Sequence, residues 1–228
     1  MHYRDASIVF DLDGTLVESA PDLLGATNHV MQHISCPEVG LDIIRPIVSN
    51  GAKAMMFAAA SAGDRHLSDE ELQDLNALFL EYYSNNAAVN SYPYEGVVGM
   101  LKMIRDAGGK LGICTNKNEM LAHRVLEGLN LHDYFDAIIG RDTLGVHKPH
   151  PEHLLGTIGK IGGNAKKAIM IGDSAPDIQA AKAAGIPVVA VSFGYTEIPV
   201  QELSPDAIIN SYEELPEVLF SLLSSPDT

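Results

Sequence analysis

The sequence contains only two cysteines in 228 residues, Cys36 and Cys114, and they lie far apart. Cys114 stands in an apolar run typical of a buried strand, so a disulfide framework is excluded and a reducing compartment is favoured. No stretch approaches the roughly 20 apolar residues that cross a bilayer, which excludes a membrane-spanning helix. The first residues resemble neither a signal peptide nor a transit sequence. We therefore expect a cytoplasmic protein.

Positive charge is also scarce, because 15 Lys and Arg residues stand against 30 Asp and Glu residues, a formal net charge of -15. A nucleic-acid backbone or an anionic membrane would meet net repulsion, so neither is an expected partner. A small anionic substrate would need a local cluster of positive groups. The hydrophobic fraction of 46% is typical of a globular protein with one large or two modest domains.

Several common enzyme motifs are missing, namely GxxxxGK[ST], GxSxG and HExxH. His147, His150 and His153 are spaced by three residues, which could indicate a metal cluster. Prolines at positions 149 and 151 break any common helical face, however, and no further ligand completes a set. We favour a loop that enters a helix near Pro151.

Short apolar runs alternate with helical segments through most of the chain. The predicted strands span residues 7–10, 111–115, 137–139, 168–171, 188–191 and 207–209, and the predicted helices 97–107, 120–129, 151–161 and 175–184, with a last helix from about 213. Helices of this length between uninterrupted apolar strands imply right-handed crossovers and a parallel sheet covered on both faces.

Residues 18–90 follow a different pattern, without strand-like alternation. Helices are predicted at 21–34 and 68–83, with an Ala- and Met-rich stretch between them and a linker at 91–96. The first strand belongs with the later ones, so this helical module is inserted. We expect an α/β protein with a Rossmann-like parallel sheet core, residues 1–17 and 91–228, and an inserted α-helical cap, residues 18–90.

Polar residues follow the predicted strands, where an open parallel sheet binds its ligands. They are Asp11, Asp13, Thr115, Asn116, Lys117, Lys148, Asp173 and Asp177. Two carboxylates about 4 Å apart repel by about 1 kcal/mol in water and about 4 kcal/mol at an effective dielectric of 20. Each acid alone fits a strand stop, a turn or a helix start. The four aspartates together favour a hard dication, and their all-oxygen ligands favour Mg²⁺.

These residues form four motifs that resemble those of the haloacid dehalogenase-like hydrolases, in order and at suitable separations. The motifs are Asp11-Leu12-Asp13-Gly14-Thr15-Leu16, Thr115-Asn116, Lys148-Pro149 and Gly172-Asp173-Ser174 with Asp177. The resemblance is greatest to bacterial phosphoglycolate phosphatases, and it extends to Leu16–Leu23 and to Asp177–Gly185. Glu18 stands where Asp is common in that family, a change that keeps the charge.

The resemblance implies a role for each motif residue. Asp11 would attack phosphorus to form an aspartyl-phosphate, and Asp13 would act as general acid and then general base. Mg²⁺ would be held by the Asp11 side chain, the Asp13 carbonyl and Asp173. Asp177 would support the metal through water or orient Lys148. The phosphoryl oxygens would be cradled by Lys148, Thr115 and the backbone at Asn116. Lys117 either borders this site or begins the next helix.

The cap would close over the site and select the leaving group. Lys53 is the only lysine at 18–90 and follows Gly51 at a helix start. We expect these two residues to bind the carboxylate of a small acid substrate, with a solvated surface lysine as the alternative reading of Lys53. Tyr82 and Tyr83 are expected to pack the cap and its hinge. The substrate implied is 2-phosphoglycolate, for a monomer or a homodimer.

Two other functions stay open. One is a phosphatase for another small sugar or amino-sugar phosphate, or a sugar phosphomutase of the same superfamily. The other is a regulatory protein that retains the fold without chemistry. The second is disfavoured because such proteins ordinarily lose catalytic residues, whereas Asp11, Asp13, Thr115, Lys148 and Asp173 are all present.

Overall fold

Six short parallel strands form the central sheet of the computed structural model, which describes residues 3–196 and 198–224. In spatial order they are β5 (Ala137–Ile139), β4 (Lys110–Cys114), β1 (Ser7–Phe10), β6 (Ala168–Gly172), β7 (Val188–Val191) and β8 (Ala207–Ile209). β1 lies in the middle, with Ser7 opposite Lys110 on one side and Ala168 on the other. This confirms the predicted parallel sheet and the place of the first strand in it.

Helices cover both faces of the sheet, as the uninterrupted apolar strands predicted. They are α5 (Val97–Asp106), α6 (Glu119–Gly128) and α9 (Leu215–Ser224) on one face, and α7 (Pro151–Lys160) and α8 (Ala175–Ala184) on the other. Alternation along β1 joins the two layers, because Ile8 and Phe10 belong to the apolar cluster of the first face and Val9 to that of the second. The fold is α/β, as expected.

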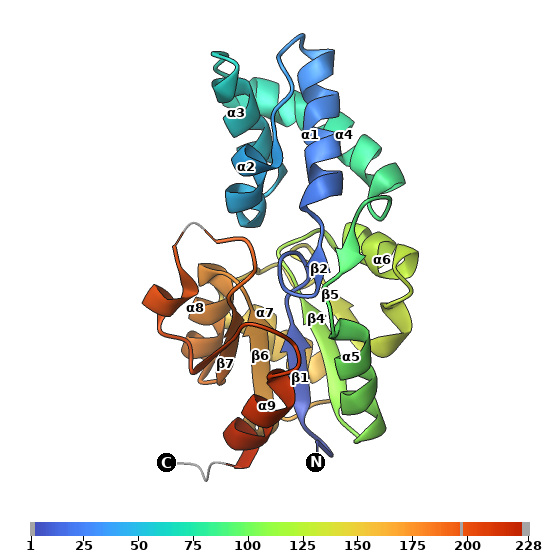
Figure 1. Ribbon diagram of the computed structural model, residues 1–228, viewed down its shortest axis with the longest axis vertical. Coiled ribbons are helices and arrows are strands. Elements are labelled where there is room, and N and C mark those ends of the chain that lie inside the picture. Colours follow the sequence, from blue (N-terminus) through green and yellow to red (C-terminus); the bar gives the residue numbers. More distant parts are fainter. Residues whose placement is uncertain (1–2, 197, 225–228) are drawn as a thin grey trace.

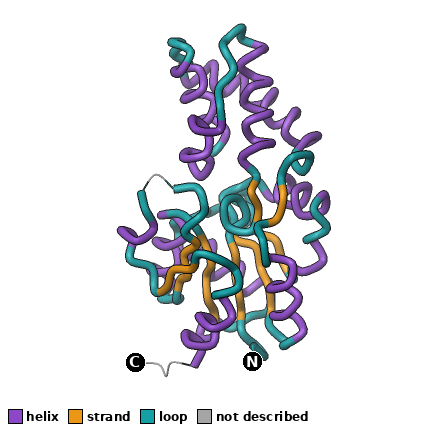
Figure 2. Tube along the Cα trace, in the orientation of Figure 1, coloured by secondary structure: helices purple, strands orange, loops and turns teal. Residues whose placement is uncertain are grey.

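A second group of helices lies beyond one end of the sheet, opposite the end near the N-terminus (Figures 1 and 2). It contains α1 (Ala20–His33), α2 (Leu41–Ile44), α3 (Ala52–Ala62) and α4 (Asp69–Asn86), with the short 3₁₀ helix η1 (Arg45–Asn50). Ser68 begins α4 with a capping box, in which its hydroxyl and Glu71 each accept a hydrogen bond from the other's backbone. α1 packs against both α3 and α4.

The segments that lead into and out of these helices form a small ladder that the sequence analysis missed. β2 (Val17–Glu18) pairs antiparallel with β3 (Tyr92–Pro93). Residues 91–96, predicted as a plain linker, therefore contain a strand. Two-residue strands are too short to show alternation, so the sequence carries no signal for them.

Three other 3₁₀ helices complete the described part of the chain: η2 (His132–Tyr134), η3 (Ala165–Lys167) and η4 (Val200–Leu203). None of the helices within residues 3–196 and 198–224 is long and apolar enough to cross a membrane. The division into residues 1–17 with 91–228 and an inserted 18–90 stays a prediction. Residues 1–2, 197 and 225–228 of the predicted core lie outside the described residues.

Candidate active site

A cavity of about 630 Å³ is lined both by loops that follow the strands and by the helices α3, α4 and η1. Of the residues predicted for the site, the lining includes Asp11, Asp13, Gly51, Lys53, Thr115, Asn116, Lys117 and Lys148. Asp173 and Asp177 lie behind this surface, while Ser174 between them lines it. The carboxyl ends of the strands thus meet at one place, as parallel strands require.

Asp11 directly follows β1 and is largely buried. Its Oδ1 forms an ion pair with Lys148 Nζ at 2.8 Å. Burial raises the pKa of Asp11 to about 6, and the nearby ammonium of Lys148 opposes the rise. The carboxylate is therefore mostly ionised at neutral pH.

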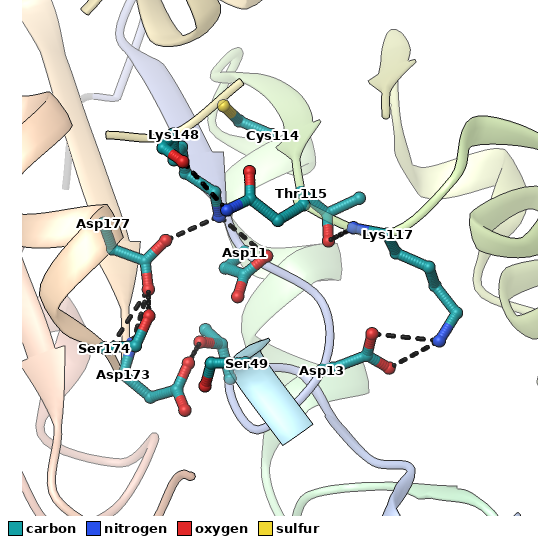
Figure 3. Close-up of polar contacts among 12 residues, drawn as sticks. Asp11, Asp13, Ser49, Cys114, Thr115, Lys117, Lys148, Asp173, Ser174 and Asp177 are labelled. Atoms are coloured by element: carbon teal, nitrogen blue, oxygen red, sulfur yellow. Dashed lines mark hydrogen bonds and ion pairs between the residues drawn. The ribbon is translucent and has the colours of Figure 1, made fainter. Parts of the chain in front are cut away.

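Lys148 is buried between two carboxylates (Figure 3). Its Nζ lies 2.5 Å from Asp177 Oδ1 as well as 2.8 Å from Asp11 Oδ1. Burial alone would lower the pKa of Lys148, but the two carboxylates raise it, and the net effect is a pKa above its ordinary value. The side chain is therefore a fixed positive charge in the site.

Asp177 lies in the first turn of α8 and is held by the backbone before the helix. Its Oδ2 accepts hydrogen bonds from the backbone N–H groups of Asp173 and Ser174 and from the Ser174 hydroxyl at 2.6 Å. Its Oδ1 accepts from Lys148. Both oxygens are thus in use, which fixes the direction in which Lys148 points.

Asp173 follows β6 and is also buried. Thr15 donates a hydrogen bond to its Oδ1 at 2.9 Å, and the backbone N–H of Tyr195 donates to its Oδ2 at 2.6 Å. Burial raises the pKa of Asp173, and the carboxylates of Asp177 and Asp11 raise it further. The site is therefore costly to ionise fully without an additional positive charge.

Three carboxylates gather at this point, since oxygens of Asp11, Asp173 and Asp177 all lie within 4.8 Å of one another. Lys148 supplies one positive charge against three negative ones. An all-oxygen donor set of this kind, with three carboxylates against one ammonium, fits a hard dication such as Mg²⁺. The Asp13 carboxylate does not belong to the group.

Asp13 turns instead toward Lys117, on the other side of Asp11 (Figure 3). Lys117 Nζ lies 3.0 and 2.9 Å from the two oxygens of Asp13, and it donates to the Tyr83 hydroxyl at 2.8 Å. Lys117 is buried and precedes α6, so it is part of the cavity wall rather than the start of the helix. Tyr83 is buried, as predicted, but its hydroxyl also reaches the site, which no sequence pattern indicated.

Gly14 allows the loop after β1 to pass close to Asp173. Its φ of +82° lies in the left-handed region, and a Cβ at this position would stand 2.5 Å from Asp173 Oδ2. A side chain would therefore strain the backbone and collide with a carboxylate. Both requirements select glycine.

Thr115 and Asn116 follow β4 at the base of the cavity. The Thr115 hydroxyl oxygen accepts a hydrogen bond from the backbone N–H of Lys117 at 3.1 Å. The Asn116 amide donates to the carbonyl of Lys148 at 2.9 Å, which joins the loops after β4 and β5. Asn116 Oδ1 is buried without a hydrogen-bond partner in the described residues.

The helical side of the cavity carries Gly51 and Lys53. Gly51 has a φ of +85° and opens α3 beside the cavity. The Lys53 ammonium is exposed and lies 2.5 Å from Gln73 Oε1. Its charge is available at the rim and lies outside the group formed by Asp11, Lys148 and Asp173.

The three histidines around Pro149 do not share one place. His153 is buried, with Nε2 3.0 Å from the Gly140 carbonyl and Nδ1 3.4 Å from Cys114 Sγ. His150 caps α7, since its Nδ1 accepts from the backbone N–H of Glu152. His147 lines the cavity.

Two features near the site were missed. Arg141 lines the cavity just after β5, and the rule that ligands bind beyond the carboxyl ends of the strands could have identified it. Glu18 is buried at the entrance to α1, where it accepts hydrogen bonds from Tyr195 Oη and Arg45 Nη2, each at 2.5 Å. Arg45 lies in η1, so this ion pair joins the helices to the ladder of β2 and β3, and no sequence signal predicts such a long-range pairing.

Known proteins resemble this chain over nearly its full length. Residues 8–191 match the sequence profile of the haloacid dehalogenase-like hydrolases. A phosphoglycolate phosphatase of Caulobacter vibrioides is 40% identical over 96% of this chain and 93% of its own length. One of Mesorhizobium japonicum is 45% identical over 91% of this chain and 92% of its own.

Solved structures agree with the fold. The crystal structure of a predicted phosphoglycolate phosphatase from Haemophilus somnus superposes with a TM-score of 0.86 at 29% identity, and the match covers 96% of this chain and 99% of the other. A putative phosphatase from Clostridium difficile gives a TM-score of 0.81 at 22% identity, over 95% of this chain and 99% of the other, which shows a shared fold.

Proposed function

This chain belongs to the haloacid dehalogenase-like hydrolases, and on that premise we propose that it is a Mg²⁺-dependent phosphatase that hydrolyses 2-phosphoglycolate to glycolate and phosphate. The observation that carries the proposal is the buried Asp11 carboxylate, paired with Lys148 at the wall of the same cavity as Asp13. The names of the relatives support the substrate.

Asp11 is the nucleophile in this mechanism. A carboxylate oxygen attacks phosphorus in line, the bond to the leaving oxygen breaks, and an aspartyl-phosphate forms. Lys148 favours the ionised form of Asp11 against the effect of burial on its pKa. Water then attacks the aspartyl-phosphate and releases phosphate, which restores the Asp11 carboxylate.

Asp13 moves the protons. It donates one to the leaving alkoxide in the first step and regains one from the attacking water in the second, so the carboxyl group enters each turnover protonated. Lys117 holds both of its oxygens and so fixes the direction of the carboxyl group. The Asp13 side chain lies on the opposite side of Asp11 from Asp173 and Asp177, so the proton transfers would take place away from the cluster of acids (Figure 3).

The transferring phosphoryl group carries negative charge that the chain must balance. Lys148 faces it with a permanent ammonium, and Thr115 and the backbone at Asn116 line the same wall. Asp11 and Asp173, with the Asp13 carbonyl, would hold Mg²⁺, while Asp177 orients Lys148. When bound, Mg²⁺ supplies positive charge that stabilises the phosphoryl oxygens.

Residues 18–90 would act as the cap that closes the cavity, on a core of 1–17 and 91–228. Lys53 at the rim of that cavity would attract the carboxylate of the substrate, beside Gly51. Lys53→Met is then expected to raise KM for phosphoglycolate with little change in kcat. Unchanged kinetics would remove Lys53 from the binding site.

The cavity volume favours a second candidate substrate class. About 630 Å³ is large for a molecule as small as phosphoglycolate, and it leaves room for a sugar phosphate. A substrate panel therefore includes sugar and amino-sugar phosphates.

For the location of the protein we propose the cytoplasm, because both cysteines are free thiols, as a reducing compartment would keep them.

Phosphate release from phosphoglycolate by the purified chain, with MgCl₂ or with EDTA, tests the proposal. We expect turnover only with Mg²⁺, and Asp11→Asn to lower kcat by about 10³-fold or more. Asp42→Asn, which changes an exposed acid of α2, is the matched control. Acid quenching should trap one phosphoryl group on Asp11. Full activity of Asp11→Asn would refute the mechanism, and faster turnover of a sugar phosphate would refute the substrate.

A further inference from the structure

Two histidines and a glutamate from α6 and the short helix η2 that follows it lie close together, away from the active site. His123 Nδ1 or Nε2, a carboxylate oxygen of Glu127 and a ring nitrogen of His132 all lie within 4.8 Å of one another. None of the three lines the active-site cavity. The group is also chemically different from the aspartate cluster, because it combines imidazole nitrogen with oxygen.

The local fold explains how residues nine positions apart meet. His123 and Glu127 stand four residues apart, on the same face of α6. The chain then reverses at Asn130, whose φ of +56° is left-handed, and the backbone N–H of Leu131 donates to the carbonyl of Leu126. Leu131 is buried in the core cluster, which anchors η2 so that His132 returns to His123.

The ring nitrogens of the two histidines are arranged in an ordered way. His123 Nδ1 lies 3.0 Å from His132 Nε2, while the other nitrogen of each ring faces a carboxylate. His123 Nε2 lies 3.8 Å from Glu119 Oε1, and His132 Nδ1 lies 3.4 Å from Asp133 Oδ1. In the tautomers that direct each N–H toward its carboxylate, the two inner nitrogens face each other as lone pairs.

The 3.0 Å contact is a hydrogen bond when one inner nitrogen carries a proton, and with both protons on the carboxylate side the two lone pairs can share a cation. Carboxylates that orient histidines in this way are the usual outer partners of metal-bound imidazoles. Two nitrogens at about 2.0–2.1 Å from a tetrahedral zinc ion would stand about 3.3 Å apart, so a small rotation of the rings suffices. Glu127 supplies a third ligand from the same helix.

We propose that His123 Nδ1, His132 Nε2 and a carboxylate oxygen of Glu127 bind one Zn²⁺ ion, with water in the fourth position. Glu119 Oε1 and Asp133 Oδ1, 3.8 and 3.4 Å from the outer nitrogens, would favour the tautomers that leave the inner nitrogens unprotonated. The nitrogen ligands select zinc over Mg²⁺, which prefers oxygen alone. The ion would clamp η2 to α6, and this site does not depend on the proposed phosphatase activity.

Calorimetric titration of ZnCl₂ into the full chain, without an affinity tag and with excess MgCl₂ present, tests the site. We expect one zinc ion per chain, and a loss of affinity of about tenfold or more in His132→Ala and in Glu127→Gln. His66→Ala, which changes an exposed histidine away from the cluster, should bind as the wild type does.

Two further measurements make the outcome decisive. Zn²⁺ should raise the Tm of the wild type and of His66→Ala, but not that of His132→Ala, since only a ligand of the native state stabilises it. Co²⁺ in place of zinc should give the visible absorption of a tetrahedral complex. The proposal would be overturned if the wild type showed no saturable zinc binding, or if His132→Ala and Glu127→Gln bound zinc as tightly as the wild type does.

Discussion

The ammonium of Lys117 lies within 3.0 Å of both carboxylate oxygens of Asp13, in a pair that is largely buried. Burial alone would lower the pKa of Lys117, but Asp13 and the Tyr83 hydroxyl raise it above its ordinary value. Asp13 thus has a permanent charged partner that reaches it from the loop before α6, and the same ammonium touches α4 through Tyr83.

Lys117→Met should lower kcat for phosphate release by about 10²-fold, because it frees Asp13 to rotate away from the leaving oxygen. Tyr83→Phe keeps the ion pair and removes one hydrogen bond, so its effect should be within about tenfold. Lys166→Met on the surface is the control. If Lys117→Met turned over at the wild-type rate, Lys117 would have no part in positioning Asp13.

Gly14→Ala should damage both stability and metal affinity. The left-handed φ of +82° and the approach of a Cβ to Asp173 Oδ2 together predict a loss of about 2 kcal/mol or more in the free energy of unfolding. The displaced Asp173 should also raise the Mg²⁺ concentration for half-maximal activity. Urea denaturation and a Mg²⁺ titration measure the two effects.

The matched control is Gly99→Ala in α5, where a Cβ meets nothing within 4 Å and φ is not left-handed. Alanine is the better helix former, so this variant should gain about 0.5–1 kcal/mol and keep its Mg²⁺ response. A destabilisation of Gly14→Ala no larger than the effect at Gly99 would contradict the close packing of the loop against Asp173.

His153 should make the protein less stable in mild acid. Burial lowers the pKa of His153 to about 4, below its value of about 6.5 in the unfolded chain. As pH falls from 6.5 to 4 the unfolded state takes up a proton that the folded state refuses, so the free energy of unfolding decreases through this window. Above pH 6.5 both states are neutral and the effect vanishes.

His153→Gln keeps a donor for the Gly140 carbonyl but cannot be protonated. The fall in the free energy of unfolding between pH 7 and pH 5 should then be smaller by about 2 kcal/mol than in the wild type. Denaturation of both proteins at the two pH values gives this difference directly. The pH-dependent contribution of the active-site acids is the same in both proteins and therefore cancels in the comparison. An equal pH response in the two proteins would show that His153 titrates normally.

The sequence predicted those parts of the molecule that depend on backbone periodicity. Apolar runs predicted all six strands of the sheet, and the rule that ligands bind beyond the strands found Asp11, Thr115 and Lys148 at a common wall. That these residues perform catalysis stays a prediction. The pairing of Lys117 with Asp13 depends on the direction of long side chains across a cavity, for which neither periodicity nor spacing is a guide.

Other features were beyond prediction for related reasons. The ladder of β2 and β3 is too short for a pattern. Glu18 is paired with Arg45 of η1 and with Tyr195, 177 positions away. The cluster of His123 and His132 requires a left-handed backbone conformation at Asn130, and one asparagine in the sequence does not by itself predict that conformation. In each case tertiary packing selects the partner.

Lys148 is the last test, because the proposed mechanism gives it a catalytic part and its two ion pairs give it a structural one. Lys148→Met would leave Asp11 and Asp177 buried without their shared partner, and breaking a buried ion pair by removing one member costs about 3–5 kcal/mol. The phosphoryl group would also lose its ammonium, so kcat should fall by about 10²-fold or more. Lys160→Met, on the surface of α7, should change neither quantity.

Asp177→Asn separates the catalytic part of Lys148 from its structural part. This variant keeps Lys148 and Asp11 but loosens the orientation of the ammonium. It should therefore lower kcat while the Asp11–Lys148 pair limits the loss of unfolding free energy to less than that of Lys148→Met. Chemical denaturation together with steady-state kinetics on the three variants would show this order, and a Lys148→Met protein as stable and as active as Lys160→Met would refute both parts.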